Sequence, residues 1–179
     1  LEIRLQFRTP PVPGGPVPVR VLIVCSGNTC RSAMGEGILR GLVGRTPDAG
    51  IDVRSAGTLG IVGAPASDEA VRVARSHGVD ISRHASSSAN AANVEAADVV
   101  LAMTEMHVEE LRERFPEAAD RIHLLSMYAD GSDIDVPDPV GGPVEEYESA
   151  YRMIAGYLTS ALPKILALAR GRSGGTDTG

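Results

Sequence analysis

The sequence predicts a single three-layer α/β domain, in which a four-stranded parallel sheet of order 2-1-3-4 carries helices on both faces. Two observations support this prediction. Short apolar runs alternate along the chain with longer segments whose apolar residues recur every three or four positions, as strands and helices alternate in parallel α/β folds. The length of 179 residues suits one domain with a substantial core, and no internal repeat divides it.

Composition narrows the choice of partners and of compartment. Aromatic residues make up only 3% of the chain, so the core must be aliphatic. The net charge of −6 argues against nucleic acid or an anionic membrane as the main partner. No segment has the apolar length of a membrane-spanning helix, and no signal-peptide pattern opens the chain. We therefore expect a soluble cytoplasmic protein, and its oligomeric state stays open.

Three stretches differ in composition. Residues 1–18 are rich in proline and glycine, which cannot support a helix or a central strand, so we expect an extended N-terminal arm without chemistry. Residues 19–170 carry the alternating pattern and form the domain. Residues 171–179 are small and polar, which is typical of a disordered tail.

The first half of the domain begins with a strand at residues 21–24, a β-branched and aliphatic run typical of a strand buried on both faces. A helix is expected over 31–45, where apolar residues follow the spacing of one helical face: Met34, Ile38, Leu42 and Val43. Residues 51–55 alternate like a second strand. The next helix should start at Ser67 and end at Gly78, with inward-facing Ala70, Val71 and Ala74.

The second half repeats the alternation. Residues 98–103 form a third buried strand, and Thr104 caps the following helix, whose buried face carries Val108, Leu111 and Phe115. Residues 121–125 give a short fourth strand. A long helix is expected from 144 to 168, where Pro163 should kink or divide it.

The loop after the first strand contains the residue types that hold an anion above a thiolate. Gly27 permits backbone N–H groups to converge, and the following helix adds unpaired N–H groups and the positive end of its dipole. Arg31 supplies a planar fork of donors that matches two phosphate oxygens. Cys25 lies at the bottom of this positive cup, which favours its thiolate. A thiolate facing a bound phosphate indicates a phosphatase that works through phosphocysteine.

Other interpretations of the loop are weaker. The spacing of Cys25 and Arg31 alone also fits a buried cysteine in an ordinary turn between a strand and a helix. A nucleotide-binding P-loop is disfavoured because the loop has no lysine. With two cysteines in the chain and no cluster of histidine or cysteine around them, neither a disulfide framework nor a zinc site is expected. We expect no metal and no other cofactor.

A second chemical element is an acid that protonates the leaving group as its bond to phosphorus breaks. The candidates are Asp133, Asp135 and Asp138 in a segment with two prolines. Asp138 is the best candidate because Pro139 fixes the chain around it, although a simple turn residue fits the local sequence equally well. The other two carboxylates are expected to be solvated.

The loop resembles the signature C-x-G-N-x-C-R-S of the low-molecular-weight protein tyrosine phosphatase family. The resemblance spans about residues 19–170, and it continues in Arg54-Ser55-Ala56-Gly57, in residues 98–103, in Asp138-Pro139 and in Gly141-Gly142. It implies phosphorylated proteins as substrates, phosphate or another oxyanion in the loop, and a general acid in the Asp-Pro pair.

We expect Cys25, Arg31 and Asp138 to perform the reaction. The thiolate attacks phosphorus, Arg31 and the loop N–H groups stabilise the equatorial oxygens, and Asp138 protonates the leaving group and then activates water. The remaining expected site residues bind substrate or support the loop: Ser26, Gly27, Asn28, Thr29, Cys30, Ser32 and Val140.

Several residues have expected supporting roles. Ser32 would donate to the Cys25 sulfur, and Asn28 would brace the loop through its amide. Ser55, at the carboxyl end of a strand, is either a simple turn residue or a support for the loop, and the resemblance implies a supporting hydrogen bond from it. Cys30 is either an apolar filler or the partner of a protective disulfide with Cys25, and the resemblance favours the disulfide. The histidines show no ligand spacing, and surface or capping positions are expected for all of them: His77, His84, His107 and His123.

Two positions bear on the substrate. Thr29 stands where family members acting on phosphotyrosine often carry a bulkier aliphatic residue. Val140 stands where they carry an aromatic ring, whose stacking is worth about 0.5–1.5 kcal/mol. Thr29 and the Gly141-Gly142 pair resemble the protein arginine phosphatases of the family, although these also tend to keep the aromatic residue. Ala33, where the family usually has proline, loosens only the start of the helix.

The sequence therefore favours neither phosphoarginine nor phosphotyrosine as the substrate. An arsenate reductase would need further redox cysteines after Cys30, and the chain has none. A non-catalytic module that binds phosphorylated residues would keep the loop but would not need the acid. The presence of Asp138 therefore argues against such a module.

Overall fold

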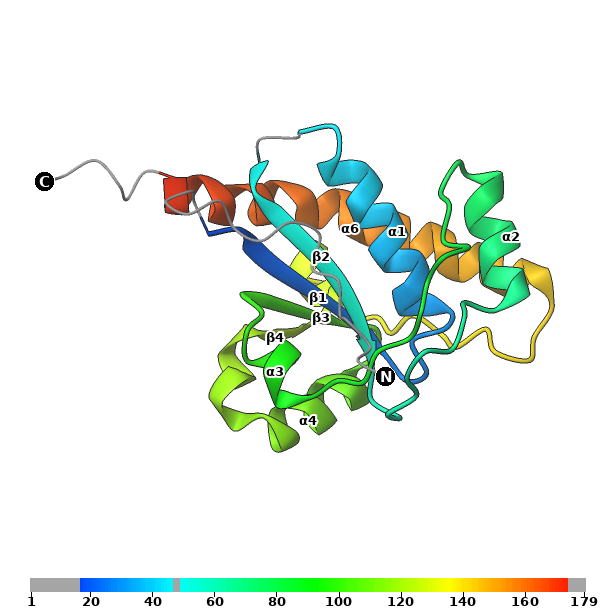
Figure 1. Cartoon of the computed structure of the whole chain (residues 1–179), viewed down its shortest axis with the longest axis horizontal. Coiled ribbons are helices and arrows are strands. Elements are labelled where there is room, and N and C mark those ends of the chain that lie inside the picture. Colours follow the sequence, from blue (N-terminus) through cyan, green and yellow to red (C-terminus); the bar gives the residue numbers. More distant parts are fainter. Residues whose placement is uncertain (1–16, 47–48, 174–179) are drawn as a thin grey trace, which may run out of the picture.

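The computed structural model describes residues 17–46 and 49–173, which form a three-layer α/β domain (Figure 1). The strands are β1 (Val19–Cys25), β2 (Ile51–Gly57), β3 (Val99–Ala102) and β4 (Ile122–Leu124). They form a four-stranded sheet of order β2-β1-β3-β4, and every neighbouring pair is parallel. The predicted sheet and its strand order are confirmed.

The longer helices lie where the sequence predicts them: α1 (Arg31–Val43), α2 (Asp68–Ser76), α4 (Glu105–Arg114) and α6 (Val144–Ser173). Helices α1 and α6 cover one face of the sheet, with α2 packed against both of them, and α3 and α4 cover the other face (Figure 1). Three short elements are not predicted: α3 (Ala91–Val94), the 3₁₀ helix Pro116–Arg121 and α5 (Leu125–Asp130). They are too short to show an apolar repeat.

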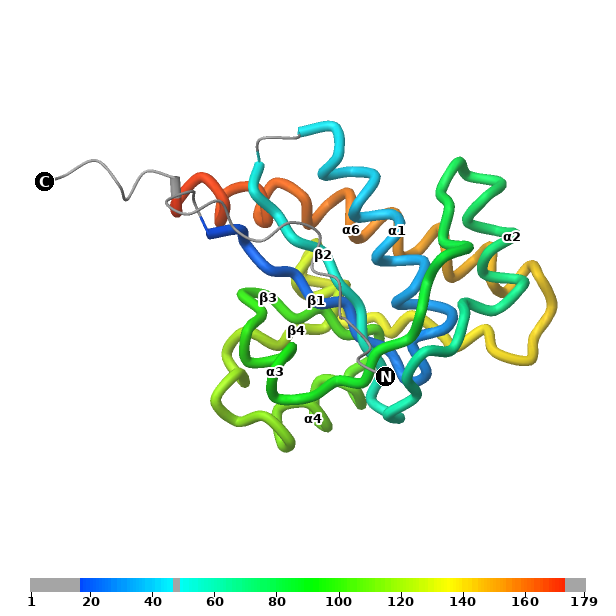
Figure 2. The backbone as a smooth tube through the Cα atoms, viewed as in Figure 1, coloured from blue at the N-terminus to red at the C-terminus, as the bar shows by residue number. Residues whose placement is uncertain are grey.

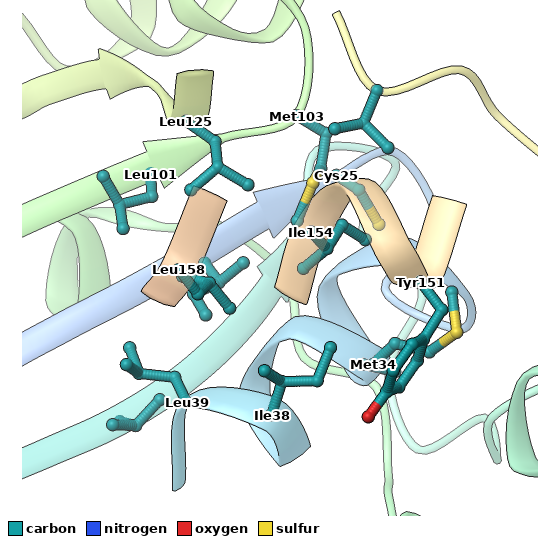
Figure 3. Close-up of a cluster of buried hydrophobic side chains, with 14 of the residues drawn as sticks. Cys25, Met34, Ile38, Leu39, Leu101, Met103, Leu125, Tyr151, Ile154 and Leu158 are labelled. Atoms are coloured by element: carbon teal, nitrogen blue, oxygen red, sulfur yellow. The ribbon is translucent and has the colours of Figure 1, made fainter. Parts of the chain in front are cut away.

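The two faces of the sheet bury separate apolar cores. In β1, Val21 and Ile23 point into the larger core, whereas Leu22 and Val24 point into the smaller one, because side chains alternate along a strand. Figure 3 shows part of the larger core, in which side chains from β1, α1, β3, α5 and α6 pack together. Cys25 is the last residue of β1 and belongs to this core, which fixes where its side chain lies.

The predicted helix caps are present. Ser67 accepts the N–H of Ala70 at the start of α2, and Thr104 accepts the N–H of His107 at the start of α4. Gly78 has φ +79° just beyond α2, a conformation that favours glycine and ends the helix. Within α2, Val73 is buried and Val71 only partly so. The predicted inward-facing set was therefore incomplete.

Helix α6 is continuous through Pro163, so the proline does not divide it. Pro163 is exposed, while Ile154, Leu158, Ala161 and Ile165 are buried on one face, and this packing outweighs the lost backbone hydrogen bond. The helix includes residues 171–173 of the predicted tail. The rest of that tail, and residues 1–16 of the predicted arm, lie outside the described residues. None of the described helices has the length and apolarity needed to cross a membrane.

Several connections meet at the carboxyl ends of the strands. Figure 2 shows the turn after β1, the cyan loop after β2 and the yellow segment that leads into α6 at the same end of the sheet. Carboxyl ends of strands are where open α/β sheets bind ligands. The fold therefore brings two stretches that are distant in the sequence to the loop that begins at Cys25.

Candidate active site

A pocket of about 180 Å³ opens at this end of the sheet. Its lining brings together eight of the ten predicted site residues: Cys25, Ser26, Gly27, Thr29, Cys30, Arg31, Asp138 and Val140. The other two, Asn28 and Ser32, are fully buried behind the loop. Leu59 and Ile61, which the sequence did not single out, also line the pocket.

The Cys25 sulfur lies against Ser32, as expected. Cys25 Sγ is 2.9 Å from Ser32 Oγ, and Asn28 Nδ2 donates to Ser32 Oγ at 2.8 Å. Ser32 Oγ accepts from Asn28, and its own hydrogen has two possible acceptors: the sulfur at 2.9 Å and the more distant Ala56 carbonyl oxygen at 3.5 Å. A hydrogen bond donated to sulfur stabilises the negative charge of a thiolate. The contact therefore suits a nucleophilic Cys25.

Asn28 uses every polar atom of its side chain to hold the loop. Its Nδ2 also donates to Ser55 Oγ at 2.9 Å, and its Oδ1 accepts the N–H of Ser87 at 2.8 Å. It is the one non-glycine residue with a positive φ in the described part of the chain, at 55°. Asparagine tolerates this conformation better than most residues. The amide therefore compensates for a backbone shape that the loop needs.

Two residues missed by the sequence analysis continue this network. Ser55 Oγ donates to the Glu36 carboxylate, which also pairs with Arg40 at 2.6 Å. His84 Nε2 donates to the Asn28 carbonyl oxygen at 2.6 Å, and the His84 side chain is only 7% exposed. The expectation that His84 lies on the surface or in a cap was wrong. A lone histidine in a polar stretch shows no periodicity that would indicate burial.

Arg31 joins the loop to the segment that carries Asp138. Its guanidinium is buried, and it donates from Nη1 to the Val136 carbonyl at 2.9 Å and from Nη2 to Asp138 Oδ2 at 3.0 Å. Within the described residues, its Nε has no hydrogen-bond partner. Val136 is itself fixed, because its N–H donates to the backbone carbonyl of Met103, the residue after β3. A buried donor without a protein partner indicates that this cup is built for an anion.

The three candidate acids occupy different places. Asp138 lines the pocket with its side chain 40% exposed. Asp133 is exposed, as expected. Asp135 is also exposed, but its Oδ1 accepts the N–H of Glu105 at 2.8 Å, so it helps to cap α4. Only Asp138 is therefore in a position to reach a group bound in the cup.

A second histidine lies behind the other end of the loop. His107 is buried, with Nε2 2.8 Å from Ser26 Oγ and Nδ1 2.9 Å from Thr104 Oγ1. Burial lowers the pKa of His107, and the Arg31 guanidinium lowers it further. The expectation of a surface or capping position was wrong here too. The sequence did contain one indication of its place. His107 lies in the first helical turn after β3, and the carboxyl ends of the strands are where the site forms.

Cys30 has surroundings unlike those of Cys25. Its sulfur is buried, 3.4 Å from Ser67 Oγ and 3.8 Å from Tyr147 Oη, and both cysteines are free thiols. Burial raises the pKa of Tyr147, which keeps this phenol neutral. No group of three metal-binding side chains occurs in residues 17–46 and 49–173.

The mouth of the pocket is aliphatic and exposed. Leu59 is 67% exposed, Val140 is 65% exposed and Ile61 is 41% exposed. Gly57, at the end of β2, permits the close approach of the loop, because a Cβ there would lie 2.6 Å from the Ser26 carbonyl oxygen. The site thus has a buried polar base and an open apolar mouth.

Comparison with known proteins agrees with this geometry. The family model described as low molecular weight phosphotyrosine protein phosphatase matches residues 20–169. The protein-arginine-phosphatase of Geobacillus stearothermophilus is 40% identical over 134 residues, which cover 75% of this chain and 87% of that protein. The low molecular weight protein-tyrosine-phosphatase Etp of Escherichia coli (strain K12) is 35% identical, covering 75% of this chain and 86% of that protein.

Solved structures give the same result. The YwlE arginine phosphatase from Geobacillus stearothermophilus superposes with a TM-score of 0.79 at 36% identity, covering 86% of this chain and 97% of that one. The low molecular weight protein tyrosine phosphatase from T. tengcongensis superposes with a TM-score of 0.77 at 38% identity, covering 82% and 99%.

Proposed function

The chain belongs to the low molecular weight phosphotyrosine protein phosphatase family, and from this premise we propose that it dephosphorylates protein side chains through Cys25, with phosphoarginine as its better substrate. The observation that carries the proposal is the pairing of a cysteine sulfur with a buried arginine in one pocket. Arg31 Nε has no partner among the described protein atoms, and Ser32 Oγ lies 2.9 Å from the sulfur.

In the first half-reaction the Cys25 thiolate attacks phosphorus and forms an S–P bond. The bond from phosphorus to the leaving nitrogen or oxygen breaks, and its electron pair goes to the leaving atom. Asp138 gives its proton to that atom, so the group leaves as an arginine guanidinium or as a tyrosine hydroxyl instead of as a strongly basic anion. Arg31 and the loop N–H groups stabilise the charge on the equatorial oxygens.

In the second half-reaction water hydrolyses the phosphocysteine. The Asp138 carboxylate accepts a proton from water while the water oxygen attacks phosphorus. The S–P bond breaks, its electron pair returns to sulfur, and inorganic phosphate leaves. Asp138 Oδ2 lies 3.0 Å from Arg31 Nη2, so one carboxylate stands beside the phosphoryl site in both steps.

Three features support phosphoarginine. Thr29 lines the pocket with a short side chain, and the mouth is formed by the aliphatic residues Leu59, Ile61 and Val140 instead of aromatic rings. Aliphatic side chains pack well on the carbon stem of an arginine but give a phenol ring no stacking partner. In addition, the Asp138 carboxylate at the pocket edge offers a planar acceptor for the guanidinium.

Other predictions extend this proposal. A reversible Cys25–Cys30 disulfide would protect the nucleophile, and the burial of both sulfurs confines such a bond to the loop itself. Phosphate and related oxyanions would bind in the same cup without a metal. The cytoplasmic location stays a prediction, and the oligomeric state stays open.

The test is a paired assay with EDTA present, using a phosphoarginine protein and a phosphotyrosine peptide as substrates. The parent should release phosphate from both and prefer phosphoarginine, while Cys25→Ser should release none. Thr29→Ile should lower the ratio of kcat/KM values for phosphoarginine over phosphotyrosine by about tenfold or more, because an ethyl group replaces the hydroxyl and narrows the pocket. A parent that prefers phosphotyrosine would reject the substrate assignment, and Cys25-independent turnover would reject the mechanism.

A further inference from the structure

A buried histidine connects α4 to the residue that follows Cys25 in the chain. His107 is 1% exposed and lies in the first turn of α4. Its two ring nitrogens are 2.8 Å from Ser26 Oγ and 2.9 Å from Thr104 Oγ1. Both ends of the ring are thus engaged, and Ser26 is 81 residues away in the sequence.

We propose that His107 is a positioning residue for dephosphorylation, which acts through Ser26 to hold Arg31 in the orientation that receives the phosphoryl group. The inference rests on the proposed function for its role in turnover. It does not depend on whether phosphoarginine or phosphotyrosine is the better substrate.

Donors and acceptors determine the direction of the hydrogen bonds. A guanidinium can only donate, so Ser26 Oγ accepts from Arg31 Nη2 at 3.5 Å. The Ser26 hydroxyl hydrogen is then donated to His107 Nε2, which leaves the ring proton on Nδ1 for Thr104 Oγ1. Thr104 is anchored in turn, because its Oγ1 also accepts the backbone N–H of His107. The series begins at Arg31 and ends at the start of α4.

The series requires a neutral ring, because a protonated imidazole has no lone pair for the Ser26 hydroxyl. Burial and the nearby Arg31 guanidinium both lower the pKa of His107. The carboxylates of Glu110, Asp135 and Asp138 act in the opposite direction, with smaller effects. The surroundings therefore keep the acceptor on Nε2 available at neutral pH.

The hydrogen bond to Ser26 gives Arg31 a contact that does not depend on the protonation state of Asp138. Arg31 Nη2 otherwise bonds only to Asp138 among the contacts found in the described residues. When Asp138 carries the proton for the leaving group, its attraction to the guanidinium is weakened. Ser26, held by His107, stays in place through that change. Arg31 Nη1 keeps its bond to the Val136 carbonyl at 2.9 Å, but without Ser26 the Nη2 end would have no second contact at the moment when the phosphoryl charge must be stabilised.

A set of substitutions at two positions separates positioning from simple packing. In His107→Asn the amide can reach Thr104 but not Ser26, whereas in His107→Gln it can reach Ser26. Ser26→Ala removes the hydroxyl itself. His123→Asn serves as the control, because burial also lowers the pKa of that imidazole but it contacts Tyr128 instead of the loop.

We expect His107→Asn and Ser26→Ala to lower kcat/KM by about tenfold and to weaken inhibition by inorganic phosphate by a similar factor, as loss of one buried hydrogen-bond partner does. The double variant should be no worse than either single variant, because the two residues act as one unit. His107→Gln should recover most of both quantities, and His123→Asn should match the parent. Ring ¹⁵N shifts of the parent should report the neutral Nδ1–H form of His107.

Two results would overturn the inference. One is unchanged phosphate affinity and kcat/KM in His107→Asn and Ser26→Ala. The other is an equal loss in His107→Asn and His107→Gln together with equal thermal destabilisation, which would show a packing role only. Phosphate protection of Cys25 against iodoacetamide gives the affinity without turnover. A parent that binds phosphate but releases none from either substrate would therefore reject the proposed function. The phosphate affinities of the parent and the variants would still test the role of His107.

Discussion

The base and the mouth of the pocket are built in opposite ways. At the base, Asn28 and Ser32 are fully buried, and their polar atoms bond to one another, to Ser55 and to the Cys25 sulfur. At the mouth, Leu59 and Val140 are more than half exposed, and Asp138 is 40% exposed. Buried, saturated networks hold one geometry, whereas exposed side chains adapt. The base therefore supplies a fixed cup for a phosphoryl group, and the mouth supplies the choice of substrate.

The largest effect is expected from breaking the base at Asn28. Asn28→Ala removes the bonds to Ser32, Ser55 and Ser87 and places alanine at a positive φ. We expect kcat to fall by about 10³-fold, because the loop donors and the sulfur are displaced together. The free energy of unfolding should fall by about 3 kcal/mol, from buried partners left unpaired and from backbone strain.

The matched variant is Asn28→Gly, which keeps the backbone conformation and loses the same hydrogen bonds. It should be more stable than Asn28→Ala by about 1 kcal/mol and nearly as inactive. Urea unfolding and steady-state kinetics measure both quantities. An Asn28→Gly protein with near-parental kcat would show that the amide bonds do not set the geometry of the cup.

A smaller and purely chemical effect is expected at the mouth from Asp138→Asn. Loss of the acid should lower kcat by about 10²-fold, at the low end of the range for general acid–base catalysis. The free energy of unfolding should change by about 1 kcal/mol or less, because the Asp138 side chain is 40% exposed and asparagine Oδ1 can still accept a hydrogen bond from the buried Arg31. Asp133→Asn, at an exposed carboxylate in the same segment, should leave kcat unchanged. Equal kcat losses in both variants would argue against Asp138 as the acid.

The same contrast explains which parts of the site could be predicted from the sequence. The loop residues are contiguous, so their order alone indicated the cup, and the strands and long helices followed from apolar periodicity. His84 and His107 meet the loop from other parts of the fold, and Glu36 reaches it only through Ser55, so no local apolar pattern indicated these contacts. The position of His107 just after β3 was the one available signal. His107, for example, reaches Ser26 across 81 residues. Leu59 and Ile61 were missed because they lie in an irregular segment after β2, whose path over the pocket depends on tertiary packing.

A third prediction concerns substrate choice at the mouth. Val140→Tyr adds a ring beside the pocket and should raise kcat/KM for a phosphotyrosine peptide about fivefold, within the range of one aromatic contact. Turnover of a phosphoarginine protein should change by less than about twofold, since a tyrosine ring can also pack against the arginine stem and the base is untouched. Val62→Tyr is the control, because Val62 is 67% exposed but does not line the pocket. A gain of the same size in the control would mean that any added ring attracts the peptide.

The smallest effect is a pH dependence of stability that arises behind the base. Burial, and next the Arg31 guanidinium, lower the pKa of His107 in the folded chain below its ordinary value of 6.5. The unfolded chain therefore takes up a proton at a higher pH than the folded chain does. The stabilisation that comes from the neutral ring is complete above about pH 6.5 and is lost as the pH falls toward the folded pKa.

Urea midpoints at pH 7.5 and pH 5.5 should differ more for the parent than for His107→Gln, which cannot titrate. His123, whose pKa burial also lowers, is present in both proteins, so its contribution cancels from the comparison. Equal pH sensitivity in the two proteins would mean that the His107 ring is protonated as easily in the folded chain as in the unfolded chain. The base of the pocket would then be more open to solvent, and more like the mouth, than its buried hydrogen bonds imply.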